Sequence, residues 1–220
     1  MTIRPEVVPF IVVVLLISSL LAVIVPPWTC TLVGCVFIGY FLYFFRDPER
    51  IPPRAETAIV AGADGTVAAV TDIHEDKYLN TDCVRISIFL SLFDVHVNRA
   101  PIAGLSMFLG YFPGKRLFTF HEKSSDVNQH NKILITGERT RCLVCQIVGP
   151  VCRRVVYWPD HNQSVPIAMG QRIGMMKFGS RLDMYFPKAD VDVLISPGTK
   201  VRAGASVVAR AKGREVESHG

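Results

Sequence analysis

Two short segments carry side chains that could take part in a reaction. One contains the step Gly179–Ser180 between two strand-like runs, and a serine hydroxyl becomes a nucleophile once a base activates it. The other holds His96, which follows a β-like run and could transfer protons near neutral pH. Each has a plainer explanation, since Gly-Ser is a common turn and most histidines serve in the surface or core. The residues alone leave both explanations open.

A carboxylate and a cysteine pair are the next candidates. Asp64 precedes Gly65, and an Asp-Gly pair forms a turn more often than it supplies a catalytic carboxylate. Cys142 and Cys145 have the spacing of half a zinc site, but no second such pair and no pair of histidines accompanies them. We therefore expect no metal. The cysteines also lack the spacing of a disulfide framework, which favours a reducing, cytoplasmic compartment.

The first element that must position these residues is an apolar N-terminus. No Asp, Glu, Lys or Arg occurs between Glu6 and Arg46. Val7–Val25 and Trp28–Phe45 are each just long enough for a membrane-spanning helix, and Pro26–Pro27 interrupts them. We expect a membrane-anchoring helical hairpin, with one long tilted or re-entrant element as the alternative.

Charge suggests how this anchor is oriented. Positive flanks stay in the cytoplasm, so we expect a cell-membrane protein with Arg4 and the globular part on the cytoplasmic side. The formal net charge of +5 lies entirely after residue 45, which favours an anionic lipid surface over nucleic acid as the partner. Five basic residues are candidates for contact with lipid: Arg46, Arg50, Arg54, Lys115 and Arg116.

The remainder of the chain has the pattern of a β-rich domain. Short apolar runs alternate with Gly, Pro, Asn and Asp, and no long amphipathic helix follows residue 55. Ala63–Val67, Val165–Gly174 and Ser196–Gly204 look like the turns of lipoyl-carrier-like sandwiches, without the lysine that a carried cofactor needs. We expect a hydrophobic hairpin over 1–50 and, over 51–220, a mainly β (β-rich α+β) sandwich- or barrel-like domain. The expected strands are Ala58–Val60, Gly65–Thr71, Cys83–Leu90, Gly104–Tyr111, Lys132–Thr136, Arg141–Val148, Val155–Trp158, Arg172–Lys177, Arg181–Phe186 and Val191–Ile195.

Five motifs in order resemble the short form of phosphatidylserine decarboxylase, a pyruvoyl-dependent family. They are Phe45–Arg50, Ala63–Val67, Asp94–Pro101, Phe120–Lys123 and Phe178–Asp183. Each motif is weak alone, whereas five in register from about Phe45 to Lys200 form a specific pattern. The apolar N-terminus also matches what such enzymes carry.

The resemblance implies a proenzyme that cuts itself between Gly179 and Ser180. The products are a β chain, 1–179, and an α chain, 180–220, which form a heterodimer; a higher oligomer is left open. Ser180 becomes a covalent pyruvoyl cofactor that forms a Schiff base with phosphatidylserine of the bilayer. Loss of CO2 then gives phosphatidylethanolamine, with the pyruvoyl imine as electron sink.

The resemblance also implies which side chains assist. His96 is the proton donor and acceptor near the pyruvoyl, and Asp64 is a carboxylate linked to self-cleavage. Longer members have a second histidine where this chain has Arg99, so either His96 serves both steps or Asp64 acts with less help. Arg99 could instead bind the substrate carboxylate or phosphate. His121, with Glu122, is a further pocket candidate.

Two alternatives stay open. One is a decarboxylase of another serine lipid, for example archaetidylserine, since the headgroup chemistry is the same. The other is a non-enzymatic, membrane-anchored lipoyl-like β adaptor, which predicts a single intact chain.

Overall fold

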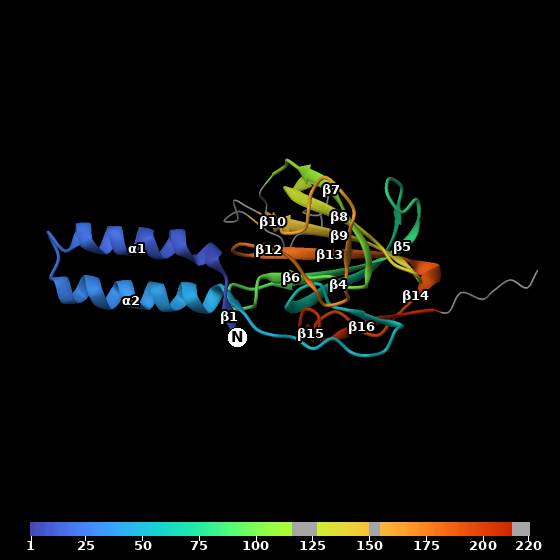
Figure 1. Cartoon of the computed structure of the whole chain (residues 1–220), viewed down its shortest axis with the longest axis horizontal. Coiled ribbons are helices and arrows are strands. Elements are labelled where there is room, and N and C mark those ends of the chain that lie inside the picture. Colours follow the sequence, from blue (N-terminus) through green and yellow to red (C-terminus); the bar gives the residue numbers. More distant parts are fainter. Residues whose placement is uncertain (116–126, 150–154, 213–220) are drawn as a thin grey trace, which may run out of the picture. The chain divides into compact units, whose positions relative to one another are not determined.

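The structure is a computed structural model that describes residues 1–115, 127–149 and 155–212. The chain forms two compact units, residues 1–49 and residues 50–220. Figure 1 labels the two long helices of the first unit and the strands of the second.

The first unit is a pair of apolar helices, α1 (Val8–Leu21) and α2 (Pro27–Phe44). A short helix, η1 (Pro5–Val7), precedes α1. Among the described residues, α2 is the one helix that is long and apolar enough to cross a membrane, and α1 is shorter. The first helix ends at Leu21, four residues before the expected Val25, and is shorter than the expected apolar run. Residues 22–25 form a turn because a residue before proline avoids the helical region, and Pro27 then opens α2.

The two ends of this hairpin are joined by a small ladder. Strand β1 (Thr2–Ile3) pairs antiparallel with β2 (Arg46–Asp47). The Arg4 N–H donates to the Phe45 carbonyl at 2.9 Å, and the Arg4 guanidinium lies 3.8 Å from the buried Asp47 carboxylate. Arg4 and Arg46 therefore lie at the same end of the hairpin.

The second unit is built on one antiparallel sheet of eight strands, in the order β11-β7-β8-β9-β13-β5-β4-β15. Two three-stranded sheets complete it, β10-β12-β6 and β14-β16-β3. The bounds are β3 Ala58–Val60, β4 Gly65–Glu75, β5 Thr81–Leu90, β6 Val97–Arg99, β7 Gly104–Phe112, β8 His130–Thr136, β9 Arg141–Val148, β10 Val155–Tyr157, β11 Val165–Ile167, β12 Arg172–Met176, β13 Ser180–Pro187, β14 Val191–Val193, β15 Lys200–Val201 and β16 Val207–Ala211. A short helix, η2 (Lys188–Asp190), follows β13.

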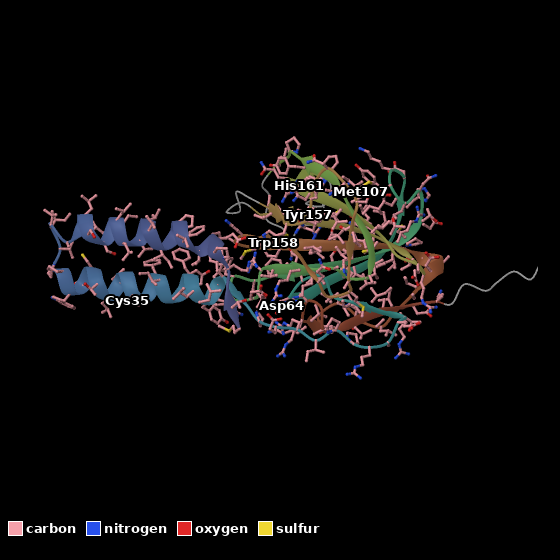
Figure 2. The ribbon with its side chains drawn as sticks, in the orientation of Figure 1. Cys35, Asp64, Met107, Tyr157, Trp158 and His161 are labelled. Carbon is pink, nitrogen blue, oxygen red and sulfur yellow. The ribbon has the colours of Figure 1, made fainter. Side chains whose placement is uncertain are left out.

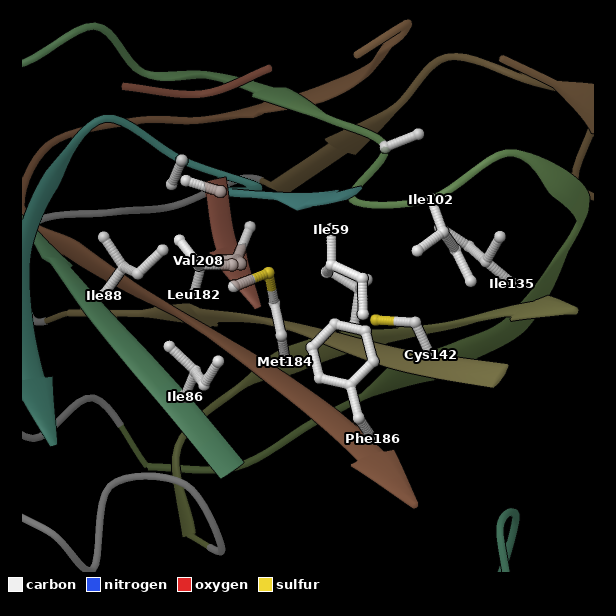
Figure 3. Close-up of a cluster of buried hydrophobic side chains, with 14 of the residues drawn as sticks. Ile59, Ile86, Ile88, Ile102, Ile135, Cys142, Leu182, Met184, Phe186 and Val208 are labelled. Atoms are coloured by element: carbon white, nitrogen blue, oxygen red, sulfur yellow. The ribbon is translucent and has the colours of Figure 1, made fainter. Parts of the chain in front are cut away.

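Strand β13 explains how the core is formed. Successive side chains of a strand point to opposite faces. Leu182, Met184 and Phe186 enter the main core with residues of β5 and β16, as Figure 3 shows. Tyr185 lies on the opposite face in a second apolar cluster. The domain buries both faces of its central strand, and the prediction of a β-rich α+β fold is confirmed.

The expected strands all occur, most of them with shifted ends. β3 and β9 match their expected ranges, whereas β12 ends one residue early at Met176 because Phe178 and Gly179 adopt left-handed backbone angles. The short strands β6, β11, β15 and β16 were not expected. The segment Phe118–Asn131, expected to be a loop or helical turn, lies mostly outside the described residues.

Candidate active site

Ser180 is the first residue of β13, the strand in the middle of the main sheet. It pairs with Leu90 at the end of β5 and with Val148 at the end of β9. Its side chain is fully buried, and its Oγ has no hydrogen-bond partner among the described residues. A buried hydroxyl without a partner is costly, and Ser87 shares this property, so the backbone before Ser180 must distinguish the two serines.

The two residues before Ser180 have left-handed backbone angles. Phe178 has φ +58° and Gly179 has φ +63°. A left-handed conformation costs a residue with a Cβ, here Phe178, roughly 1–2 kcal/mol, whereas glycine tolerates it. Among the described residues no atom lies within 4 Å of a Cβ placed on Gly179, so the glycine is needed there for its backbone conformation. A sharp turn therefore leads directly into the bond Gly179–Ser180.

His96 lies next to the strand that leads to this turn. Its carbonyl accepts from the N–H of Met176, the last residue of β12, at 3.2 Å. The ring is fully buried, and Nδ1 is 2.9 Å from the Asp94 carbonyl oxygen. A carbonyl can only accept, so this contact assigns the proton to Nδ1 and leaves Nε2 as the proton acceptor of the neutral ring.

Asp64, labelled in Figure 2, lies in the turn before β4. One carboxylate oxygen is 2.8 Å from Arg50 Nη2, and the other accepts the Ala203 N–H at 2.8 Å. Both side chains of the ion pair are mostly buried. Arg50 was named as a candidate for lipid contact, and in the structure its guanidinium is directed to Asp64. The two residues are 14 positions apart with strand β3 between them, and nothing in the sequence signalled this pair.

Arg99 connects three turns. Its Nη1 donates to the Gly170 carbonyl at 2.9 Å, and its backbone N–H donates to the Gly62 carbonyl at 2.9 Å. A Cβ on Gly204 would lie 2.7 Å from Arg99 Cδ, so the side chain packs closely against that turn. Arg99 is buried and has this structural role, whether or not it also contacts substrate.

Strand register brings these residues to one end of the main sheet. Ser180 is opposite Leu90, and Thr66, two residues after Asp64, is opposite Phe89 on the other side of β5. His96 lies beside Met176, four residues before Ser180. The structure thus gathers Ser180, His96 and Asp64, whereas His121, Glu122 and Arg116 lie outside the described residues.

A buried chain of amides extends this site and was missed by sequence reasoning. Asn131 Nδ2 donates to Gln146 Oε1 at 3.3 Å, and Gln146 Nε2 donates to Asn98 Oδ1 at 2.8 Å. Gln146 is opposite Leu182, which shares its face of β13 with Ser180. Asn98 lies inside a motif already singled out, but nothing local indicated its partner 48 residues away.

The opposite face of β13 carries a buried ion pair. Arg181 Nε is 2.9 Å from Asp183 Oδ1, and Arg181 Nη2 donates to Asp183 Oδ2 at 3.1 Å. Both side chains are at most 5% exposed. These two charges belong to β13 itself, on the face opposite the Ser180 side chain.

The cysteine pair does not form a metal site. Cys142 belongs to the main core and Cys145 to the second cluster, so strand alternation points the two thiols to opposite faces. Burial raises the pKa of Cys83 to about 11 and keeps its thiol protonated near neutral pH. Within the described residues, no three His, Cys, Asp or Glu side chains cluster as metal ligands would.

A buried serine after a left-handed glycine, with a histidine and a paired carboxylate at the same sheet end, defines a candidate enzyme site. The family model described as phosphatidylserine decarboxylase matches residues 37–209. The chain is 40% identical over 197 residues to the phosphatidylserine decarboxylase proenzyme of Carboxydothermus hydrogenoformans, covering 90% of this chain and 91% of that one. It is 39% identical over 198 residues to the proenzyme of Chlorobium phaeobacteroides, with coverage of 89% and 91%. The chain belongs to the phosphatidylserine decarboxylase family, as the motifs predicted.

Proposed function

We propose that this chain decarboxylates phosphatidylserine to phosphatidylethanolamine and CO2, after cutting itself between Gly179 and Ser180. Family membership supports the reaction. The observation that best supports this site concerns Ser180, which directly follows two residues with left-handed backbone angles. Its hydroxyl is buried and has no hydrogen-bond partner in the described part of the chain.

Self-cleavage would begin with Ser180 Oγ attacking the Gly179 carbonyl, which turns the amide into an ester and frees the Ser180 nitrogen. Loss of the Ser180 Cα proton and β-elimination then release the Gly179 carboxylate and leave dehydroalanine. Water converts that group to a pyruvoyl and releases ammonia. The left-handed turn supports this course, because backbone strain at Phe178 would be relieved when the chain is cut.

The two products would remain one folded unit. Strand β13 of the α chain lies between β5 and β9 of the β chain, and β16 lies between β14 and β3. Separating the chains would require breaking both ladders of the central strand. The register therefore supports an α/β heterodimer.

The position of Ser180 fits a pyruvoyl group. Ser180 is fully buried, and among the described residues no atom lies within 4 Å of a Cβ placed on Gly179. The pyruvoyl carbonyl would supply an electrophile for the substrate amine and an electron sink for the departing CO2. A dry site assists, because a carboxylate without its hydration loses CO2 more readily.

His96 and Asp64 take complementary roles in this proposal. His96 carries its proton on Nδ1, so Nε2 would accept and return a proton at the reacting carbon. Asp64 is held in place by Arg50 and Ala203 and would favour positive charge near the cut during self-cleavage. Arg50 thus gives Asp64 a partner in a chain that lacks the second histidine.

We further propose that residues 1–50 anchor the enzyme in the cell membrane, with residues 51–220 on the cytoplasmic side. The adjacent ends of the hairpin support a common side for Arg4 and Arg46, since β1 pairs with β2. Keeping the enzyme at the bilayer shortens the search for a lipid substrate.

Intact-mass spectrometry of the purified protein tests the proposal. We expect an α chain of about 4.5 kDa, estimated from its share of the sequence, with a blocked N-terminus. Ser180→Ala should remain one chain of 24.4 kDa without activity. Ser87→Ala is the matched control, because Ser87 is equally buried and its hydroxyl also has no partner in the described part, yet it lies on the opposite face of β5. Cutting of Ser180→Ala, or a wild-type protein that stays intact and inactive on phosphatidylserine, would overturn the proposal.

A further inference from the structure

We propose that an exposed apolar turn, Leu92–Phe93, inserts into the lipid bilayer next to the reacting centre. This docking turn would bring the Ser180 end of the sheet to the lipid headgroups. The inference rests on the proposed function and names the surface through which the same site meets its substrate.

The docking turn exposes two adjacent large apolar side chains. Leu92 is 45% exposed and Phe93 is 67% exposed. Single exposed apolar residues are ordinary, whereas large apolar side chains grouped at a loop tip mark interaction sites. The turn begins just after Leu90, whose strand partner is Ser180. The exposed pair therefore lies at the reacting end of the sheet.

Hydrogen bonds hold this turn in one conformation. The N–H and the hydroxyl of Ser91 donate to Asp94 Oδ2 at 2.8 and 2.6 Å. The Asp94 N–H donates back to the Ser91 carbonyl at 3.1 Å. The Asp94 carbonyl accepts from His96 Nδ1, so the docking turn is connected directly to the proposed proton carrier. A turn ordered in advance loses little entropy on docking.

Other exposed residues at this end of the sheet have the chemistry of a membrane interface. Lys115 is exposed and bridges to Asn128, whose side chain donates to the carbonyl of Val148, the strand partner of Ser180. Tyr111 is 53% exposed on β7, which lies four strands from β5 in the same sheet. Tyrosine and lysine collect where the bilayer meets water, and an apolar turn at the same end of the sheet fits lipid better than a polar partner.

Tryptophan fluorescence tests insertion directly in the full chain. Phe93→Trp is reconstituted in phosphatidylserine–phosphatidylcholine vesicles whose acyl chains carry bromine, and wild-type emission from Trp28 and Trp158 is subtracted. We expect the added emission to be quenched. Leu105→Trp is the control, because Leu105 is 51% exposed at the opposite end of the sheet, opposite Thr136. An unquenched Phe93→Trp would overturn the inference, even if both variants are active.

Kinetics test whether insertion matters. The double variant Leu92→Ser/Phe93→Ser should lose at least about tenfold in kcat/KM on long-chain phosphatidylserine in vesicles. That is the effect expected when two apolar side chains no longer become partly buried in the bilayer. It should keep its self-cleavage and its rate on monomeric short-chain phosphatidylserine. Leu105→Ser/Met107→Ser should leave both rates unchanged.

The outcomes separate the possibilities. An equal loss on both substrates, or a change in oligomeric state without quenching, would overturn the inference in favour of a folding role or a contact with a second copy. A wild-type protein that decarboxylates neither substrate would refute the proposed function, while quenching would still decide whether the turn docks.

Discussion

Removing the charge of Asp183 should destabilise the domain strongly. Asp183→Asn keeps the shape of the side chain but leaves the Arg181 guanidinium, which is 4% exposed, without its carboxylate. Breaking a buried ion pair from one side costs about 3–5 kcal/mol, because an uncompensated charge stays in the interior. For a chain of this size, each kcal/mol shifts Tm by about 2–4 °C, so we expect a fall of about 6–20 °C.

Thermal unfolding of the full chain in detergent measures this effect by near-ultraviolet circular dichroism. Glu56→Gln is the control, because Glu56 and Arg139 form an ion pair at 3.3 Å whose side chains are 85% and 42% exposed. Exposed pairs contribute up to about 1 kcal/mol, so the control should change Tm by no more than about 4 °C.

A second variant separates charge from packing. Replacing both residues, as in Arg181→Met/Asp183→Leu, also removes the buried guanidinium that has lost the Asp183 carboxylate and should recover most of the lost stability. If Asp183→Asn and Glu56→Gln lower Tm equally, or if the double variant is as unstable as Asp183→Asn, the argument from an uncompensated buried charge is refuted.

Three further predictions concern the site and the anchor. His96→Ala should lose about 10²–10⁴-fold in CO2 release from phosphatidylserine, and full turnover would remove His96 from the mechanism. Arg50→Gln should slow the appearance of the α chain on a gel, because Asp64 loses its ion-pair partner. An unchanged rate would show that this ion pair has no part in self-cleavage. Deleting residues 1–45 should leave cutting intact but weaken membrane association; a truncated protein that stays fully in the membrane fraction would locate the anchor elsewhere.

Local pattern predicted the strands that are apolar runs bounded by polar or turn residues. Arg141–Val148 was expected at its observed bounds, since the residues after Arg141 are apolar with Gln146 as the one polar interruption. The short strands β6 and β15 contain polar or charged residues and have no such run. They form because neighbouring strands offer hydrogen bonds to them.

The end of α1 shows a similar limit. The uncharged run predicted an apolar helix up to Val25, whereas the helix stops at Leu21. Composition measures how long an apolar stretch is, but the turn before Pro26 uses part of that stretch.

The sequence by itself determined the β-rich class, the apolar hairpin and, through its ordered motifs, the family and the identity of Ser180, His96 and Asp64 as candidates. Only the tertiary structure decided what surrounds them: the Arg50–Asp64 ion pair, the amide chain ending at Asn98 and the exposed turn at Phe93. The physical reason is that these contacts depend on strand order and register, which bring together residues far apart in the chain. Periodicity and motif spacing report which residues share a face, but not which other strand will lie against that face.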